Sequence, residues 1–185
     1  MKVNCTILIL AAGSSSRMGL PKQLLLWKNT TLLGNIIQQA TQTNVENVVV
    51  VLGANSDEVE TKVDFKNTTV IHNNRWKSGM GTSISCGIEF IQNNFPNCTN
   101  VLITLSDQPY ITSLYFKKMI DEFNSTSKNI VATKVENRIS VPAIFDAFYF
   151  KELKKLNADD GAKSILKKHQ QNTKLISSKI HFTDI

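Results

Sequence analysis

The residues best suited to chemistry lie in one short segment near the start of the chain. Residues 10–22 read LAAGSSSRMGLPK, which combines small residues and two glycines with two cations, Arg17 and Lys22. Glycine reaches the backbone angles that a tight wrap needs, and consecutive backbone N–H groups form a concavity that binds phosphate. Because the cations add positive charge to this concavity, we interpret the segment as a triphosphate-binding loop.

Two common phosphate motifs do not fit this loop. The P-loop has four residues between its glycines and a Lys after the second, whereas five residues separate Gly13 from Gly19 and Leu20 follows. The dinucleotide fingerprint GxGxxG is absent because Ser15 stands at its second glycine. The residues therefore predict an anion site without naming its ligand, and a connecting loop with no ligand stays the alternative.

A carboxylate after a later apolar segment is the second candidate. Asp107 follows the apolar residues 101–105 and precedes Gln108 and Pro109. Mg²⁺ favours one or two carboxylates together with phosphate oxygens, so Asp107 is well placed to hold this ion. The alternative is an Asp that caps a turn before proline.

The elements that must position these residues alternate along the chain, which predicts an α/β fold with a mostly parallel sheet covered by helices on both faces. We expect strands at 6–10, 48–52, 69–72, 101–105, 130–133 and 141–145, and an edge strand at 174–177. We expect helices at 30–43, about 83–93, 146–156 and 160–170. Two further helices should begin after N-caps, a short one after Ser56 and one that runs from Thr112 to about 123. Ligands bind beyond the carboxyl ends of such strands. The first loop, the loop at 73–83 and Asp107 should therefore converge on one cleft.

Length and composition favour a single domain over residues 1–185, which is long enough to bury a core. No apolar run approaches the roughly 20 residues of a membrane span, and no signal-peptide cleavage pattern follows the first apolar stretch. Three cysteines without C-x-x-C spacing fit a reducing compartment. We therefore expect a cytoplasmic protein without a membrane partner. The net charge of +6 suits polyanionic small substrates, and because the lysines are not clustered with aromatic residues we expect no nucleic-acid partner.

The first loop resembles the pattern LAAGxSxRMGxPK of the nucleotidyltransferases related to molybdenum cofactor cytidylyltransferase, and every fixed position is filled. The resemblance implies a three-layer, Rossmann-like α/β fold of the nucleotide-diphospho-sugar transferase type. It also implies that Arg17, Lys22 and Asp107 are catalytic, and that Asp107, in the family's DQP segment, ligates the Mg²⁺ cofactor. The nucleotide-binding residues implied in this way are Leu10, Ala11, Ala12, Gly13, Ser14, Arg17, Lys22, Gly79, Thr82, Ser83 and Asp107.

Residues 73–83 resemble a second family pattern, NxxWxxGMxxS. The resemblance implies that Gly79 and Ser83 help to read the base, with Thr82 beside them at the start of a helix. Taken alone, Ser83 has a second interpretation as the N-cap of that helix. We expect Trp76 to be a packing residue and not a stacking platform.

The acceptor side resembles the family less closely. Residues 140–145 are similar to GxPxxF, with Ser140 at the glycine position, and the resemblance implies that Pro142 and Gln108 bind the acceptor. Residues 158–163 are similar to GDxGAR, with Ala158 at the first glycine and Lys163 at the arginine. Lysine keeps the charge but loses the bidentate fork for phosphate. Read without the family, Asp159 is a helix N-cap, and we do not expect Asp184 to reach the metal.

The reaction implied by the resemblance is transfer of CMP from CTP to the phosphate of molybdopterin, with release of pyrophosphate. Ala12 and Pro21 favour CTP over GTP, because guanylyl relatives usually carry Gly and an acidic residue there. A molybdoenzyme or its chaperone is the implied protein partner. The alternatives are a sugar or polyol phosphate acceptor, the use of GTP, or a non-catalytic module that delivers a nucleotide or cofactor.

Overall fold

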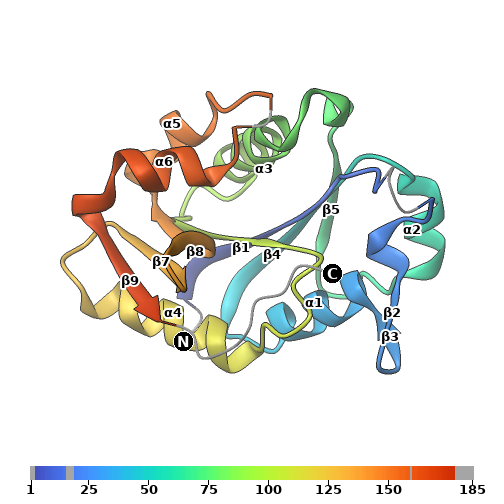
Figure 1. The fold of residues 1–185 in the computed structure, drawn as a ribbon, viewed down its shortest axis with the longest axis horizontal. Helices are drawn as coiled ribbons and strands as arrows, with labels where there is room; N and C mark the ends of the chain where they lie inside the picture. Colours follow the sequence, from blue (N-terminus) through green and yellow to red (C-terminus); the bar gives the residue numbers. More distant parts are fainter. Residues whose placement is uncertain (1–2, 16–18, 159, 178–185) are drawn as a thin grey trace.

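A seven-stranded sheet forms the centre of this computed structural model, which describes residues 3–15, 19–158 and 160–177 (Figure 1). The strand order is β5-β4-β1-β6-β8-β7-β9, with β1 at Val3–Ala11, β4 at Val45–Leu52, β5 at Thr69–His72, β6 at Asn100–Leu105, β7 at Ile130–Val135, β8 at Arg138–Asp146 and β9 at Thr173–Ser177. Neighbouring strands are parallel except that β8 runs antiparallel to β6 and β7. The predicted mostly parallel sheet is confirmed, and the predicted edge strand is β9.

Helices cover both faces of this sheet, as predicted (Figure 1). They are α1 at Leu32–Thr41, α2 at Ser56–Lys62, α3 at Met80–Asn94, α4 at Ser113–Ser125, α5 at Phe150–Leu153 and α6 at Ala162–Lys168. Four 3₁₀ turns lie in the described ranges: η1 at Lys22–Leu24, η2 at Trp76–Ser78, η3 at Ala147–Tyr149 and η4 at Gln170–Asn172. A small hairpin, separate from the main sheet, pairs β2 at Leu26–Trp27 with β3 at Thr30–Thr31. None of the helices in the described ranges is long and apolar enough to cross a membrane.

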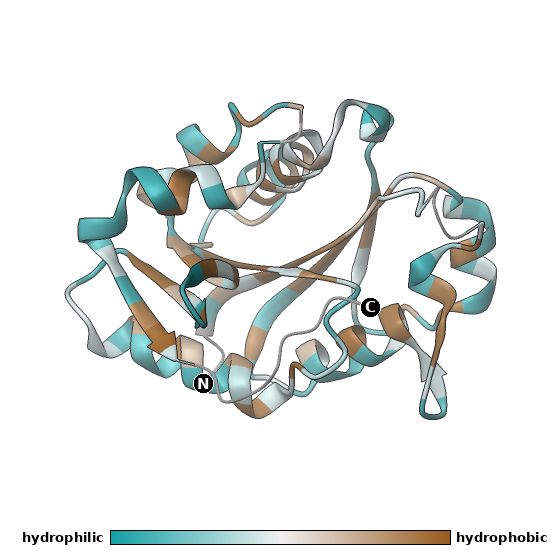
Figure 2. Cartoon of the chain, in the orientation of Figure 1, coloured by the Kyte–Doolittle hydropathy of each residue, from teal (hydrophilic) through white to brown (hydrophobic). Residues whose placement is uncertain are grey.

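The apolar core lies in two layers, one on each side of the sheet. In β1, Ile7 and Ile9 join the cluster under α1 and α4, whereas Leu8 and Leu10 join the cluster under α3, α5 and α6. Successive strand side chains point to opposite faces, so a strand that is buried on both faces must be apolar at every position. Figure 2 shows the resulting continuous hydrophobic colouring of the central strands.

Several helix boundaries differ from the predicted ones. The prediction that Ser56 caps α2 is wrong: Val59 N–H donates to the Asn55 carbonyl at 3.0 Å, so Asn55 is the N-cap and Ser56 is the first helical residue. Thr112 does cap α4, since its Oγ1 accepts from Tyr115 N–H at 3.3 Å.

Three other predicted helices are shorter in the structure. Helix α1 begins at Leu32 because Thr30 and Thr31 pair with the β2 strand. The segment at 146–156 divides into η3 and the single turn of α5, and the helix predicted at 160–170 is α6, with Gly161 as its N-cap. Asp159, which the sequence alone indicates as a cap, lies outside the described residues.

The start of α3 lies directly against Asn157, Ala158 and Asp160. A Cβ atom on Gly81 would lie 2.6 Å from the carbonyl oxygen and 2.7 Å from the nitrogen of Asn157, and 2.7 Å from the carbonyl oxygen of Asp160. Gly81 N–H also donates to the Ala158 carbonyl at 2.9 Å. Only glycine allows this backbone contact, which brings Ala158 and Asp160 of the family-like segment to the helix end that borders the site described below.

We expect Gly81→Ala to lower the free energy of unfolding by about 1–3 kcal/mol, because backbone atoms cannot yield to the new methyl group as a flexible side chain does. Urea denaturation followed by circular dichroism would measure this. Asn93→Ala, at an exposed position of the same helix, is the control and should stay within about 0.5 kcal/mol of wild type. Equal stability of Gly81→Ala and wild type would contradict the contact.

Candidate active site

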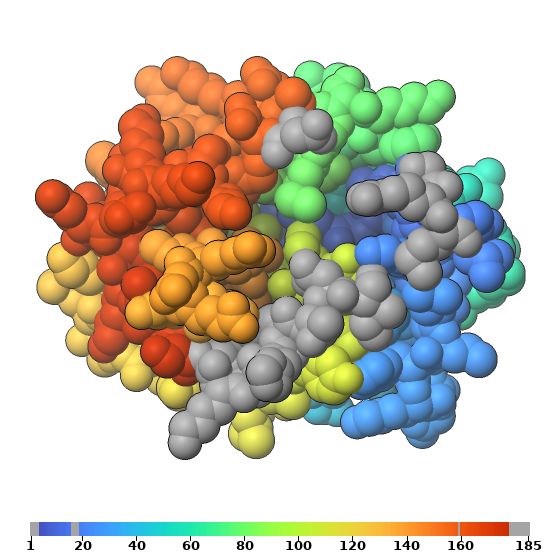
Figure 3. Space-filling view, in the orientation of Figure 1, coloured from blue at the N-terminus to red at the C-terminus, as the bar shows by residue number. Residues whose placement is uncertain are grey.

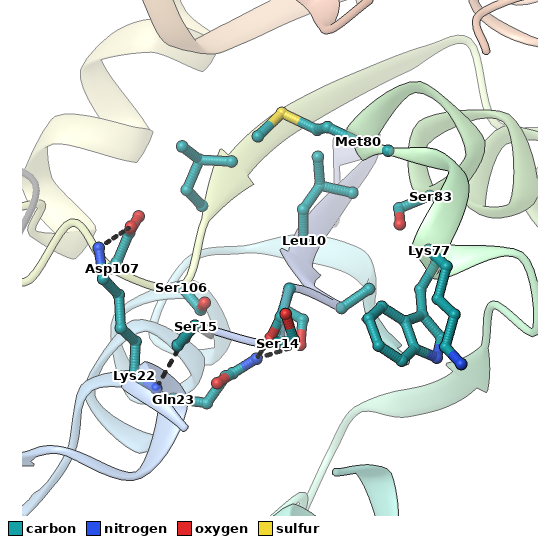
Figure 4. A pocket seen from close by; sticks show the side chains of 16 residues that line it. Leu10, Ser14, Ser15, Lys22, Gln23, Lys77, Met80, Ser83, Ser106 and Asp107 are labelled. Carbon is teal, nitrogen blue, oxygen red and sulfur yellow. Dashed lines mark hydrogen bonds and ion pairs between the residues drawn. The ribbon is translucent and has the colours of Figure 1, made fainter. Parts of the chain in front are cut away.

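A cavity of about 410 Å³ opens at the carboxyl ends of β1 and β6 (Figure 4). Its lining comprises Leu10, Ala11, Ala12, Gly13, Ser14, Ser15, Lys22, Gln23, Trp76, Lys77, Gly79, Met80, Ser83, Leu105, Ser106 and Asp107. The sheet reverses its strand order here, because β4 and β6 lie on opposite sides of β1. This is where open α/β sheets bind ligands. In Figure 3 the hollow lies beside the green residues at the start of α3.

The first loop is folded back on itself. Ser15 has φ 51°, and its Oγ accepts a hydrogen bond from Lys22 N–H at 3.0 Å. This bond joins two residues that are seven positions apart in the sequence. The Ala12 carbonyl accepts from Ala54 N–H at 3.1 Å and ties the loop to the segment after β4. The predicted nucleotide-binding residues Leu10 to Ser14 and Lys22 all line the cavity. Arg17, predicted to be catalytic, lies outside the described residues.

Lys22 and Asp107 face each other at one side of the cavity (Figure 4). Lys22 Nζ lies 3.8 Å from Asp107 Oδ2, and their side chains are 31% and 24% exposed. Asp107 is held there because Ser106 N–H donates to the Leu10 carbonyl at 3.1 Å, which joins the end of β6 to the end of β1. The structure thus brings together a cation and a carboxylate that are 85 residues apart in sequence.

The loop before α3 forms the opposite side of the cavity. Trp76, Lys77, Gly79, Met80 and Ser83 line it, and Gly79 has φ 99°, a backbone angle that favours glycine. Trp76 also packs against the core, as predicted. The N-cap of α3 is Gly79, so the alternative of Ser83 as N-cap is wrong.

The buried side chain of Asn73, which is 3% exposed, holds this loop. Its Nδ2 donates to Thr82 Oγ1 at 2.8 Å and to Ser83 Oγ at 2.9 Å, while its Oδ1 accepts from Arg75 N–H at 2.9 Å. Thr82 lies behind the cavity lining, with its hydroxyl 2.8 Å from the Gly79 carbonyl oxygen. Asn73 therefore fixes the orientation of Ser83, the residue expected to read the base.

Two polar side chains of the site, Asn73 and Gln23, were not predicted. Gln23 is 3% exposed, and its Nε2 donates to the carbonyls of Ala11 and Gly13. Asn73 opens the second family pattern, which is a usable signal. A glutamine directly after Lys22 carries no comparable signal, since its partners are known only once the loop is folded.

The predicted acceptor residues lie outside the cavity lining. Gln108 is 4% exposed, and its Nε2 lies 3.4 Å from the Val141 carbonyl oxygen. Pro142 is buried in β8, where its carbonyl accepts from Thr133 Oγ1 at 2.7 Å. Gln108 therefore contacts β8, and Pro142 is part of that strand. The role of both residues in acceptor binding stays a prediction.

The donor set around Asp107 fits a metal that is shared with a substrate. Across the described ranges, no group of three or more His, Cys, Asp or Glu residues is arranged to hold a metal ion. Mg²⁺ retains several water ligands and binds through one or two carboxylates and substrate phosphates. A single carboxylate beside an anion-binding loop matches this mode of binding and not a cage made by protein alone.

We expect Asn73→Ala to lower the free energy of unfolding by about 2–3 kcal/mol, because the buried Ser83 and Thr82 hydroxyls and the Arg75 N–H each lose their hydrogen bond to Asn73. Thermal denaturation would measure the change. Asn74→Ala, at the exposed neighbouring position, is the matched control and should melt close to wild type. A small effect for both variants would mean that Asn73 does not hold the loop.

Comparisons with known proteins identify the family. Residues 7–173 match the model of the MobA-like NTP transferase domain. The chain is 32% identical over 113 residues to the molybdenum cofactor cytidylyltransferase of Escherichia coli K12, and 27% identical over 134 residues to the bifunctional protein GlmU of Francisella tularensis subsp. novicida. These alignments cover 60% and 71% of this chain but only 56% and 28% of the relatives.

Solved structures show the same fold. The Rv0371c homologue from Mycobacterium sp. strain JC1 superposes with a TM-score of 0.83 at 26% identity, covering 96% of this chain and 87% of that one. A nucleotidyl transferase from Methanothermobacter gives a TM-score of 0.78 at 16% identity, covering 95% and 88%. Because the family model matches nearly the whole described chain, this protein belongs to the MobA-like NTP transferase family.

Proposed function

We propose that this protein is a magnesium-dependent nucleotidyltransferase that transfers CMP from CTP to the phosphate of a molybdopterin-type acceptor and releases pyrophosphate. The observation that carries the proposal is the meeting of Lys22 and Asp107, 3.8 Å apart, beside the glycine-containing loop after β1. Membership of an NTP transferase family supports the nucleotide, and similarity to a molybdenum cofactor cytidylyltransferase supports the acceptor.

The protein's own residues position and neutralise charge in this reaction. The acceptor phosphate is already an anionic nucleophile, so attack on the α-phosphorus of CTP needs no general base. The first loop wraps the triphosphate, and the Lys22 ammonium offsets negative charge on it and on the departing pyrophosphate. Gly79 and Ser83 face the base from the opposite side of the cavity.

Asp107 would hold the metal ion through its carboxylate. When bound, Mg²⁺ supplies positive charge to the phosphate oxygens and orients the leaving group. A structural neighbour, Rv0371c from Mycobacterium tuberculosis, was crystallised in complex with manganese, which supports a divalent ion in this fold. The choice of Mg²⁺ rests on Asp107, the one carboxylate among the described residues that line the cavity.

The residues at positions 12 and 21 support CTP as the nucleotide. Ala12 lines the cavity, and Pro21 precedes Lys22. A molybdoenzyme or its chaperone as protein partner follows only from the proposed acceptor. A polyol or sugar phosphate is the second candidate acceptor, since the fold is shared, with a TM-score of 0.69 at 17% identity, with the 4-diphosphocytidyl-2C-methyl-D-erythritol synthase of Anaerococcus prevotii.

We expect Lys22→Ala and Asp107→Ala each to lower kcat by about 10²–10³-fold, because each removes charge stabilisation from the transition state. Their ion pair is partly exposed, so the free energy of unfolding should change by less than about 1 kcal/mol. Steady-state kinetics and urea denaturation of the same preparations would measure both quantities. Wild-type rates in both variants would refute the proposed roles.

Pyrophosphate release with CTP, GTP, ATP and UTP, each with Mg²⁺ and molybdenum-loaded molybdopterin, tests the proposed reaction. We expect release with CTP that depends on molybdopterin. Release only with sugar or polyol phosphates would replace the acceptor. Nucleotide binding without release for any pair would favour a delivery module.

A further inference from the structure

We infer that Gln23 is a positioning residue, whose buried side-chain amide sets the shape of the triphosphate-binding loop before the nucleotide arrives. The inference deepens the proposed function and rests on it for the identity of the ligand. It concerns a residue that follows Lys22 directly and does not need to touch the nucleotide.

The amide nitrogen of Gln23 bridges two carbonyls of the loop. Nε2 lies 2.8 Å from the Ala11 oxygen and 2.7 Å from the Gly13 oxygen, and the side chain is buried at the base of the cavity (Figure 4). Both N–H groups of the amide are therefore used within the loop. Because Gln23 lies in η1, its side chain links the end of β1 to the segment that carries Lys22.

Chemistry fixes the orientation of this amide. A flipped amide would place Oε1 against two carbonyl oxygens, where all three atoms are acceptors. In the observed orientation Oε1 is buried and has no hydrogen-bond partner among the described residues. An amide that leaves its own oxygen unsatisfied in order to donate twice indicates that the two carbonyls are the important partners.

The effect on the loop is electrostatic as well as geometric. With Ala12 bonded to Ala54 N–H, three successive carbonyls, at Ala11, Ala12 and Gly13, all accept hydrogen bonds from protein donors. Carbonyl oxygens that are engaged in this way are turned away from an incoming anion. Within the described part of the loop, this leaves backbone N–H groups, the Ser14 hydroxyl and the Lys22 ammonium as polar groups that can meet phosphate.

Two isosteric substitutions separate this role from simple packing. Gln23→Met keeps the volume, removes both donors and also removes the unsatisfied oxygen, so the fold should survive. We expect it to raise the Kd of CTP, measured with Mg²⁺ by calorimetry, by about tenfold, because two hydrogen bonds of ordinary strength are lost. Gln23→Glu should raise the Kd further at pH 8, where a carboxylate faces two carbonyl oxygens.

The pH dependence of Gln23→Glu is the readout that a packing role would not produce. At pH 5.5 a buried carboxyl group beside two carbonyls is protonated and donates one hydrogen bond. The CTP Kd of Gln23→Glu, divided by that of wild type, should therefore fall to the ratio found for Gln23→Met or below it. Gln92→Glu, at an exposed position of α3, adds the same charge and should match wild type at both pH values.

Amide hydrogen exchange tests the loop without any ligand. Ala54 N–H, bonded to the Ala12 carbonyl, and Lys22 N–H, bonded to Ser15 Oγ, report the position of the loop. We expect both amides to exchange several-fold faster in Gln23→Met than in wild type. Wild-type exchange rates would overturn the inference, whether or not CTP binds.

The outcomes distinguish this inference from the proposed function. If wild type does not bind CTP but Gln23→Met exchanges faster, the nucleotide is wrong and the positioning role of Gln23 holds. If wild type binds CTP and Gln23→Met exchanges both amides at wild-type rates, the positioning role is wrong and the nucleotide stands.

Discussion

The structure depends on the burial of β1 on both faces and its pairing on both edges. Parallel neighbours β4 and β6 flank it, and apolar layers cover it from either side. The first loop therefore emerges at the carboxyl edge of the sheet from a strand that is held on both edges and both faces. An anchor of this kind suits a binding site whose groups must be fixed in position.

The neighbouring strands deliver the other groups to the same edge for the same reason. The register of β6 against β1 places Leu105 beside Leu10, so Asp107 is carried to the mouth of the first loop. Beyond β5, Asn73 shapes the turn that leads into α3. One side of the site thus carries Lys22 and Asp107, and the other carries Trp76, Lys77, Gly79, Met80 and Ser83.

The fold was largely predictable from the sequence, because strands buried on both faces leave continuous apolar runs such as residues 48–52 and 101–105. The cap of α4 at Thr112 was predicted correctly. At the start of α2, Asn55, Ser56 and Asp57 all suit a cap, and the structure uses the first.

The site was predictable where a pattern marks it, as for Lys22 and Asp107. Gln23 could not be found in this way, since its burial depends on carbonyls that meet it only after the loop has folded. Gln108 and Pro142 are the opposite case. Their pattern suggests the acceptor, yet both side chains are buried and neither lines the cavity.

We propose that one cavity gathers the triphosphate, the metal ion and the Lys22 ammonium. A crystal structure with Mn²⁺ and a non-hydrolysable CTP analogue would test this arrangement, because the anomalous signal of manganese locates the ion independently of the nucleotide. We expect manganese on the Asp107 carboxylate, the Lys22 ammonium on a phosphate oxygen and the base between Gly79 and Ser83. A nucleotide bound at another surface, or manganese away from Asp107, would contradict it.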